Sequence, residues 1–285
     1  MINNPQWSSN MKHLWLTAKL DIVESLRARW FMIYTLVFGG IIALLFAFGL
    51  TESRILGFYG LSRLLVTYIQ LSMAILPIFV LITTVRSVAG DREAGVFEYL
   101  LSLPVSLSAW YWGKISGRFL VVFIPVFAAM LAAAILALIK DVDVPWAMFI
   151  YYTGLLASIS WCFLGIGMLV STIARSIDVA QGAAFMVWLT MILFLDLIFL
   201  GIMIHGHVAP EVVVALALLN PLQVFRTAAL MLFDPQLVVI GPAAYVIFDY
   251  FGGPLFKVYA LIYPVMLGTV AASGGFFLFR RGDLP

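Results

Sequence analysis

The side chains of this chain that could bind a metal lie close together near position 205. Met203, His205 and His207 stand at alternate positions after a long apolar segment. Thioether and imidazole groups are ligands that copper accepts, Cu(I) in particular. The three residues are therefore a candidate copper contact, although histidines at a membrane surface commonly face water and bind nothing.

A second candidate is Asp196, an acid within the otherwise apolar run LFLDLIFL. An ionisable group deep in a bilayer is costly unless it faces a partner or the interior of a helix bundle. Asp196 could line a translocation path, hold two protomers together, or be protonated and hydrogen-bonded to a neighbouring helix. Gln70 and Thr67 are the candidate partners on another apolar segment.

Motifs for catalysis are missing from the sequence. It contains no G-x-x-x-x-G-K-[ST] phosphate loop and no H-E-x-x-H zinc motif. Cys162 is the only cysteine, which excludes an internal disulfide and a CxxC metal or redox site. We therefore expect no catalytic residue, no bound cofactor and no ATPase activity in this chain, and an intramembrane enzyme is disfavoured.

The composition places these residues in a membrane. The chain of 285 residues is 64% hydrophobic and 11% charged, whereas a soluble domain carries about 25% charged residues. A net charge of +2 without a basic run gives no reason to expect a nucleic-acid partner. We predict an all-α polytopic membrane protein, a single transmembrane domain over 1–285. Six segments suit spans of roughly 20 residues: 30–50, 64–85, 119–139, 147–173, 180–204 and 257–279.

The basic residues predict how the chain is oriented. With a cytoplasmic N-terminus, eleven of the 16 Lys and Arg residues fall on the inner side of the membrane. An excess of basic residues in cytoplasmic segments is the rule for helical membrane proteins. We therefore expect a multi-pass protein with both termini in the cytoplasm.

The region 205–256 divides into short apolar runs. Asn220-Pro221, Asp234-Pro235 and Gly241-Pro242 interrupt them, and each run is too short to cross a bilayer. We expect kinked, interfacial or half-inserted helices on the outer side. The alternative is a further pair of helices at 211–233 and 236–251, which would add two crossings.

The segment 11–29 predicts an amphipathic helix that leads into the first span. One arc of this helix would be apolar, with Trp15, Leu16, Ile22, Val23 and Leu26, and the opposite arc would carry Thr17, Asp21, Glu24 and Ser25. Such a helix would lie along the inner leaflet, either moving with the protein or serving as a static anchor.

The loop between the second and third spans predicts a short cytoplasmic helix at 91–103. Asp91 can cap a helix over about 92–102, and Pro104 would end it. A second helix would then begin at Ser106 or Ser108 and run through an aromatic belt into the third span. A stiff helix held between two spans is a part on which a soluble motor domain can push; without such a partner it would be an interfacial loop.

This loop resembles that of ABC-2 type permeases. Its order E-x-G-V-x-E-x-L-L-S-L-P-V-S, followed by W-Y-W-G-K, is similar to the family's E-x-G-T-x-E-x-L-L-S-x-P-[VI]-S/T-R followed by G-K. The amphipathic start, the six spans and Asn220-Pro221 followed by Phe225-Arg226 extend the resemblance over nearly the whole chain. Val96 and Leu107 depart from the pattern, standing where Thr and a basic residue are usual. The matching positions are Glu93, Gly95, Glu98, Leu100, Leu101, Ser102, Pro104, Ser106, Gly113 and Lys114.

The resemblance implies a permease that works with other chains. Its partners would be a second copy of itself and a cytoplasmic ABC ATPase dimer, which binds ATP and Mg, in a bacterial or archaeal cytoplasmic membrane. The residues that couple it to the ATPase would be Glu93, Gly95, Glu98, Leu101 and Pro104. The chain also resembles the permease of the copper-handling system that matures nitrous-oxide reductase, which implies a periplasmic copper-binding partner.

Three functions are compatible with these residues. The first is an ABC permease that exports a substrate or serves a periplasmic partner, including copper delivery. The second is an ABC-2 exporter of another substrate, such as a drug, lipid, polysaccharide or ion. The third is a scaffold that translocates nothing and passes ATP-driven motion to a periplasmic protein, which the large outer region 205–256 would suit.

Overall fold

The computed structural model is helical throughout the residues that it describes, with no strand among them. The described residues are 5–27, 33, 36–37, 40, 58–102, 105–139, 146–205, 210–232, 249–250 and 252–281. The long and short helices are α1 Pro5–Arg27, α3 Phe58–Thr84, α4 Arg86–Glu93, α5 Val96–Ser102, α6 Leu107–Ile139, α7 Trp146–Ile173, α8 Ile177–His205, α9 Pro210–Leu219, α10 Pro221–Leu230 and α12 Gly252–Arg281. The predicted all-α class is confirmed.

Four stretches of the described chain are long and apolar enough to cross a bilayer. They correspond to the second, third, fourth and sixth expected spans. α8 covers the expected fifth span, with the shorter apolar part Ile177–Leu193. The expected first span at 30–50 lies outside the described residues apart from single positions, so the count of six stays a prediction. The four stretches are Leu71–Glu93, Leu107–Ala132, Trp146–Ile173 and Gly252–Arg281.

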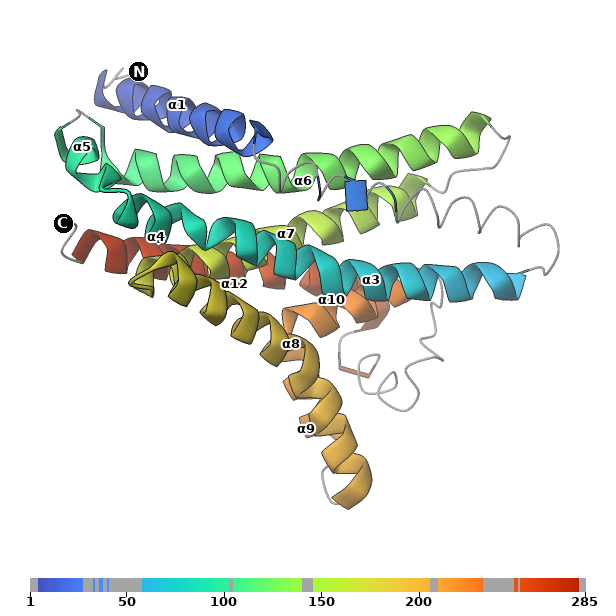
Figure 1. Ribbon diagram of the computed structural model, residues 1–285. Coiled ribbons are helices and arrows are strands. Elements are labelled where there is room, and N and C mark those ends of the chain that lie inside the picture. The colour runs from blue at the N-terminus through green and yellow to red at the C-terminus, as the bar shows by residue number, and fades with distance from the viewer. Residues whose placement is uncertain are drawn as a thin grey trace.

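α7 lies at the centre of the bundle, where it packs against α3, α6, α8, α10 and α12. Its tightest neighbour is α12, because Gly165 and Gly268 face each other: a Cβ added to Gly165 would overlap the Gly268 carbonyl group. Small residues allow helix backbones to approach closely in membrane bundles. α8 leaves this bundle at an angle and projects from its side together with α9 (Figure 1).

α1 runs beside the N-terminal half of α6 (Figure 1). Its large apolar side chains are exposed. The polar Asp21 is only 2% exposed and faces α6 together with Ala18. Glu24, which was expected on the arc of Asp21, is exposed instead. The amphipathic character of this helix and its location along the inner leaflet stay predictions. The outward residues are Trp15, Leu16, Leu20, Val23 and Leu26, which are 40–61% exposed.

The region after α8 forms two short helices instead of one long one. Asn220 ends α9 and caps α10: its side-chain oxygen accepts a 2.9 Å hydrogen bond from the Leu222 amide. Pro221 occupies the first turn of α10, where its missing N–H costs nothing. The first helix of the alternative pair, 211–233, is therefore divided at Asn220, and whether this region adds two crossings stays a prediction. α10 packs among α3, α7 and α12, and 233–248 lies outside the described residues.

Candidate functional site

The connection between α3 and α6 contains two helices where the sequence predicted one over 92–102. α4 and α5 are separated at Ala94 and Gly95, and Gly95 has a φ of +68°. The Ala94 amide donates to the Gly90 carbonyl at 3.0 Å and the Gly95 amide donates to the Arg92 carbonyl at 3.2 Å, so α4 ends in a left-handed turn that favours glycine. Asp91 was predicted to cap the single helix over 92–102; it lies within α4 instead, and this prediction is wrong.

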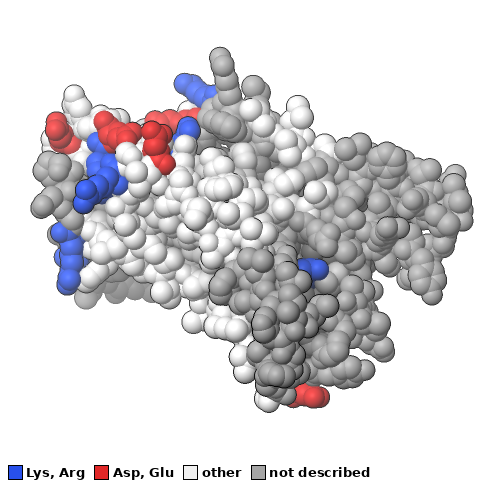
Figure 2. Space-filling model, turned by 60° about the horizontal axis from the view of Figure 1, so that its bottom comes forward, with Lys and Arg blue, Asp and Glu red and all other residues white. Residues whose placement is uncertain are grey.

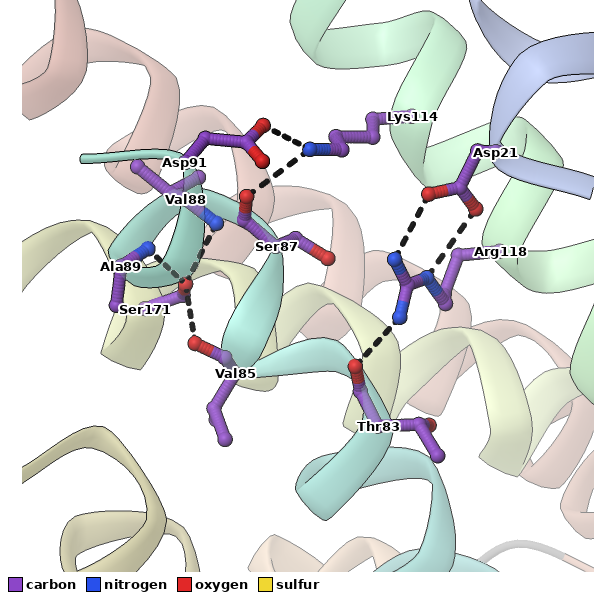
Figure 3. A network of polar contacts seen from close by, with 10 residues as sticks. All are labelled: Asp21, Thr83, Val85, Ser87, Val88, Ala89, Asp91, Lys114, Arg118 and Ser171. Carbon is purple, nitrogen blue, oxygen red and sulfur yellow. Dashed lines mark hydrogen bonds and ion pairs between the residues drawn. The ribbon is translucent and has the colours of Figure 1, made fainter. Parts of the chain in front are cut away.

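The backbone amides in the first turn of α4 donate hydrogen bonds to a side chain from another helix. Val85, at the N-cap position, has no hydroxyl or carboxylate to offer. The Ser171 hydroxyl of α7 accepts hydrogen bonds from the Val88 and Ala89 amides at 2.9 and 3.0 Å and donates to the Val85 carbonyl at 2.6 Å (Figure 3). The first-turn amides of a helix need acceptors from outside it. Ser171 supplies one and thereby fixes α4 to α7.

Lys114 of α6 holds the middle of α4. Its ammonium forms an ion pair with Asp91 and donates to the Ser87 carbonyl at 3.0 Å (Figure 3). The same ammonium lies 4.9 Å from the centre of the Trp110 ring, a favourable cation–π distance. Lys114 is 9% exposed, and a charge buried to that degree requires such partners.

Arg118, one turn further along α6, joins three helices. Its guanidinium binds both carboxylate oxygens of Asp21 on α1, at 2.7 and 3.2 Å, and donates to the Thr83 carbonyl of α3 at 2.6 Å (Figure 3). Thr83 lies in the last turn of α3, where carbonyl groups lack helical partners and attract a cation. The forked geometry fixes orientation as well as distance. α6 therefore connects the amphipathic helix to the end of α3.

Two glycines of α6 allow α1 to come close enough for this contact. A Cβ added to Gly113 would lie 2.7 Å from the Leu14 carbonyl oxygen, and one added to Gly117 would lie 2.6 Å from that of Ala18. Gly113 and Gly117 are four residues apart, so both face α1.

The last turn of α4 contacts the turn between α7 and α8. The Arg92 guanidinium donates to the Ala174 carbonyl at 2.7 Å and to the Thr172 carbonyl at 3.3 Å. The Glu93 carboxylate accepts a 3.0 Å hydrogen bond from the Ile177 amide, the first residue of α8. Glu93 is therefore exposed and at the same time hydrogen-bonded to the start of α8.

α5 is anchored on one side and free on the other. The Phe97 ring packs against Trp110 and Phe279, with ring centres 5.5 and 5.4 Å apart. Glu98 and Tyr99 point away from this aromatic cluster, and Tyr99 is 75% exposed. A short helix with a buried aromatic base and an exposed acidic and aromatic surface can receive another protein.

The structure brings together part of the predicted site. Glu93, Gly95 and Glu98 lie on the α4–α5 connection as expected. Among the residues that the structure describes, no group of three His, Cys, Asp or Glu side chains could hold a metal ion, and the copper contact stays a prediction. Five of the predicted site residues lie on helices, but the structure does not describe their side chains: Gln70, Leu101, Asp196, Met203 and His205. Two more, Pro104 and His207, lie outside the described residues.

Sequence reasoning missed the polar contacts that join the helices on and around the connection. Asp21 and Arg118 are 97 positions apart, and Ser171 is more than 80 positions from its partners in α4. The signal available was a charged residue interrupting an otherwise small or apolar helix face, as Arg118 does after Gly113 and Gly117. Such a pattern indicates that the charged residue is buried, but it does not indicate which residue is its partner.

A helical bundle with several membrane-crossing stretches and a polar, ion-paired connection between two of them defines a polytopic membrane protein. The sequence profile described as "ABC-2 family transporter protein" matches residues 15–284, so the chain belongs to this family of transporter membrane subunits. It is similar to the "Probable ABC transporter permease protein NosY" of Pseudomonas aeruginosa, with 26% identity over 230 residues, 79% of this chain and 84% of that one. The protein of the same name from Stutzerimonas stutzeri is 25% identical over 230 residues, 79% of this chain and 83% of that protein.

Proposed function

We propose that the chain is the permease subunit of an ABC transporter and that the α4–α5 connection receives movement from a separate cytoplasmic ATPase. The observation that carries this proposal is the contrast between the two sides of the connection. One side is held by an ion pair and hydrogen bonds to α6, α7 and α8, and the other exposes Glu98 and Tyr99. A displacement of α5 would therefore reach the membrane helices.

The proposal places the connection and both termini in the cytoplasm of a bacterium or archaeon. The start of α1 and the end of α12 lie at the end of the bundle where α5 lies (Figure 1). Charged side chains gather at that end, and the described surface elsewhere in this view is mostly uncharged, apart from a basic side chain near the middle and an acidic one at the lower edge (Figure 2). This distribution supports a cytoplasmic location for the charged end, because basic residues accumulate on the inner side of a membrane.

ATP and Mg would bind to an ATPase dimer, and this dimer would bind two copies of the permease. The family supports the ATPase partner, since its members are the membrane parts of ABC transporters. This chain would supply the mechanical link and bind no nucleotide.

The work done on the outer side would be copper delivery for the maturation of nitrous-oxide reductase, with a periplasmic copper-binding protein as partner. The resemblance to the permease of that system supports this assignment, and so do the relatives named NosY. Met203, His205 and His207 would contact the metal as cargo. Export of a drug, lipid, polysaccharide or ion, or a scaffold role without translocation, would leave the inner side of the mechanism unchanged.

Charge reversal on α5 tests the proposal. We expect Glu98→Lys to lower the stimulation of the co-purified ATPase by the permease about tenfold, because the exposed face of α5 would repel its binding surface. Glu24→Lys, an equal change on the exposed face of α1, is the matched control and should retain stimulation. A Glu98→Lys protein that binds the ATPase and stimulates it normally would show that the coupling site is elsewhere.

A further inference from the structure

Two neighbouring residues of opposite charge bind the two ends of the α7–α8 turn. Arg92 donates to carbonyl groups at the C-terminal end of α7, at 3.3 Å for Thr172 in its last turn and 2.7 Å for Ala174 directly after it. Glu93 accepts from the Ile177 amide, the first of α8, at 3.0 Å. α4 thus holds one helix by its C-terminus and the next by its N-terminus.

Each charge matches the helix end that it contacts. Carbonyl groups without helical partners make a helix C-terminus partly negative, and free amides make an N-terminus partly positive. Arg92 meets the negative end of α7, and Glu93 meets the positive end of α8. Exchanging the two residue types would turn both contacts into repulsions, so the order of the charges is specific to this turn.

Further contacts along α4 extend the same attachment. Ser171, in the last turn of α7, binds the Val88 and Ala89 amides. With its amide turned so that both groups are satisfied, Gln181 of α8 accepts hydrogen bonds from Arg86, the first residue of α4. α4 is therefore fixed to α7 and α8 from its first residue to its last.

We propose that α4 and the α7–α8 turn move as one body and that Arg92 and Glu93 are the positioning residues that make α8 follow α5. This inference rests on the proposed function, in which movement of α5 reaches the membrane helices, first α6 because Phe97 of α5 packs against its Trp110, and adds a second route through α8. α8 has 29 residues and is roughly 43 Å long at 1.5 Å per residue. Because it leaves the bundle at an angle, a small rotation at its first turn becomes a large displacement at its far end (Figure 1).

The two routes can be measured separately in the full chain bound to the ABC ATPase that co-purifies with it, in lipid nanodiscs. Spin labels on Met186→Cys of α8 and Met266→Cys of α12 report the movement of α8. Labels on Leu131→Cys of α6 and Met266→Cys report the movement of α6. All three positions are at least 38% exposed, and the native Cys162 is fully buried, so labelling is directed to the introduced cysteines. Electron-electron distances are recorded with and without Mg and a non-hydrolysable ATP analogue.

Substitutions at Glu93 distinguish a helix contact from a direct charge contact with the ATPase. Glu93→Ala removes the acceptor for the Ile177 amide, whereas Glu93→Gln keeps an acceptor oxygen and loses only the charge. We expect the nucleotide-dependent shift of the α8–α12 distance to fall roughly two- to tenfold in Glu93→Ala and to be retained in Glu93→Gln. Arg92→Ala should act as Glu93→Ala does. The α6–α12 shift should persist in every variant, and Asp178→Ala, which removes an exposed acid from the first turn of α8, should change neither.

The inference is overturned if Glu93→Ala leaves the α8–α12 shift at its wild-type size, or if Glu93→Gln abolishes it as fully as Glu93→Ala does. It is also overturned if α6 moves in the wild-type protein and α8 does not, an outcome that leaves the proposed function intact. If neither distance responds to nucleotide in the wild-type protein, the proposed function fails as well.

Discussion

Ser171 supplies the N-terminal cap of α4, which the residue before α4 cannot supply. Helices usually begin after a residue whose side chain accepts from the first free amides, and α4 begins after Val85. The hydroxyl of Ser171 performs this role from α7 and is itself fully buried. One side chain therefore determines both where α4 begins and which helix it follows.

Removing this hydroxyl should weaken the site measurably. Ser171→Ala leaves the Val88 and Ala89 amides without their acceptor in a buried position, which costs roughly 1–3 kcal/mol of unfolding free energy. Ser160→Ala is the matched control: Ser160 is equally buried, but its hydroxyl bonds only to the Leu156 carbonyl of its own helix. Denaturant unfolding in detergent micelles compares the two, and equal stability of both variants would contradict the role given to Ser171.

The Asp21–Arg118 ion pair should show coupling that an exposed pair lacks. Asp21 is 2% exposed and the Arg118 side chain 16%, so Asp21→Asn leaves the partly buried guanidinium without its counter-charge, at a cost of about 3 kcal/mol. The double variant Asp21→Asn with Arg118→Gln should be less destabilised than the sum of the single variants, because it removes both charges. Thermal unfolding supplies the measurement, and Glu24→Gln on the exposed face of α1 is the control, expected to change stability by no more than about 0.5 kcal/mol. Additive single effects would show that the two charges do not depend on each other.

The sequence was informative about exposed residues of the site and uninformative about buried partners. Glu98 could be placed on the connection because its motif is local and continuous along the chain. The partner of Lys114 could not be inferred, because Asp91 at the start of an apolar pattern has the same appearance as a helix cap. Which of the two roles a carboxylate takes depends on where α6 lies, and that is decided by packing.

At the scale of elements, the break between α4 and α5 separates a fixed helix from an exposed one. Gly95 makes the break possible because its φ of +68° is accessible to glycine at little cost. The sequence predicted a continuous helix here, since the pattern of apolar residues from Val96 onward contains no proline until position 104. A glycine within such a pattern indicates a helix end only once its left-handed φ is known.

Gly95→Ala should therefore strain the connection. A left-handed conformation costs a residue with a Cβ roughly 1–2 kcal/mol, and we expect loss of that stability together with reduced ATPase stimulation. Gly90→Ala, five residues earlier and inside α4, is the matched control. Its Cβ would meet only the Ile177 side chain at an ordinary 3.6 Å, and alanine is the better helix former, so this variant should be at least as stable as the wild type. Should Gly95→Ala be as stable and active as Gly90→Ala, the left-handed turn would have no role in coupling.

At the scale of the whole molecule, the sequence predicted the membrane class and the approximate spans because both depend on the length of apolar segments. The four stretches suited to crossing a bilayer coincide with predicted spans. The arrangement of these helices was not predictable, since the α7–α12 contact depends on Gly165 and Gly268 meeting across more than 100 positions. Apolar segments specify that helices form, and the small and polar residues on them specify how the helices meet.

The central claim is that a soluble ATPase acts on this bundle through the exposed face of α5. Two tyrosines allow a direct measurement, because Tyr99 on α5 is 75% exposed and Tyr250, just before α12, is 73% exposed. A photo-crosslinking amino acid is placed at each position in turn in living cells. We expect the residue at 99 to be crosslinked to an ABC ATPase and the residue at 250 to give no such product. Crosslinking of the ATPase from position 250, or from neither position while the complex remains intact, would contradict the account.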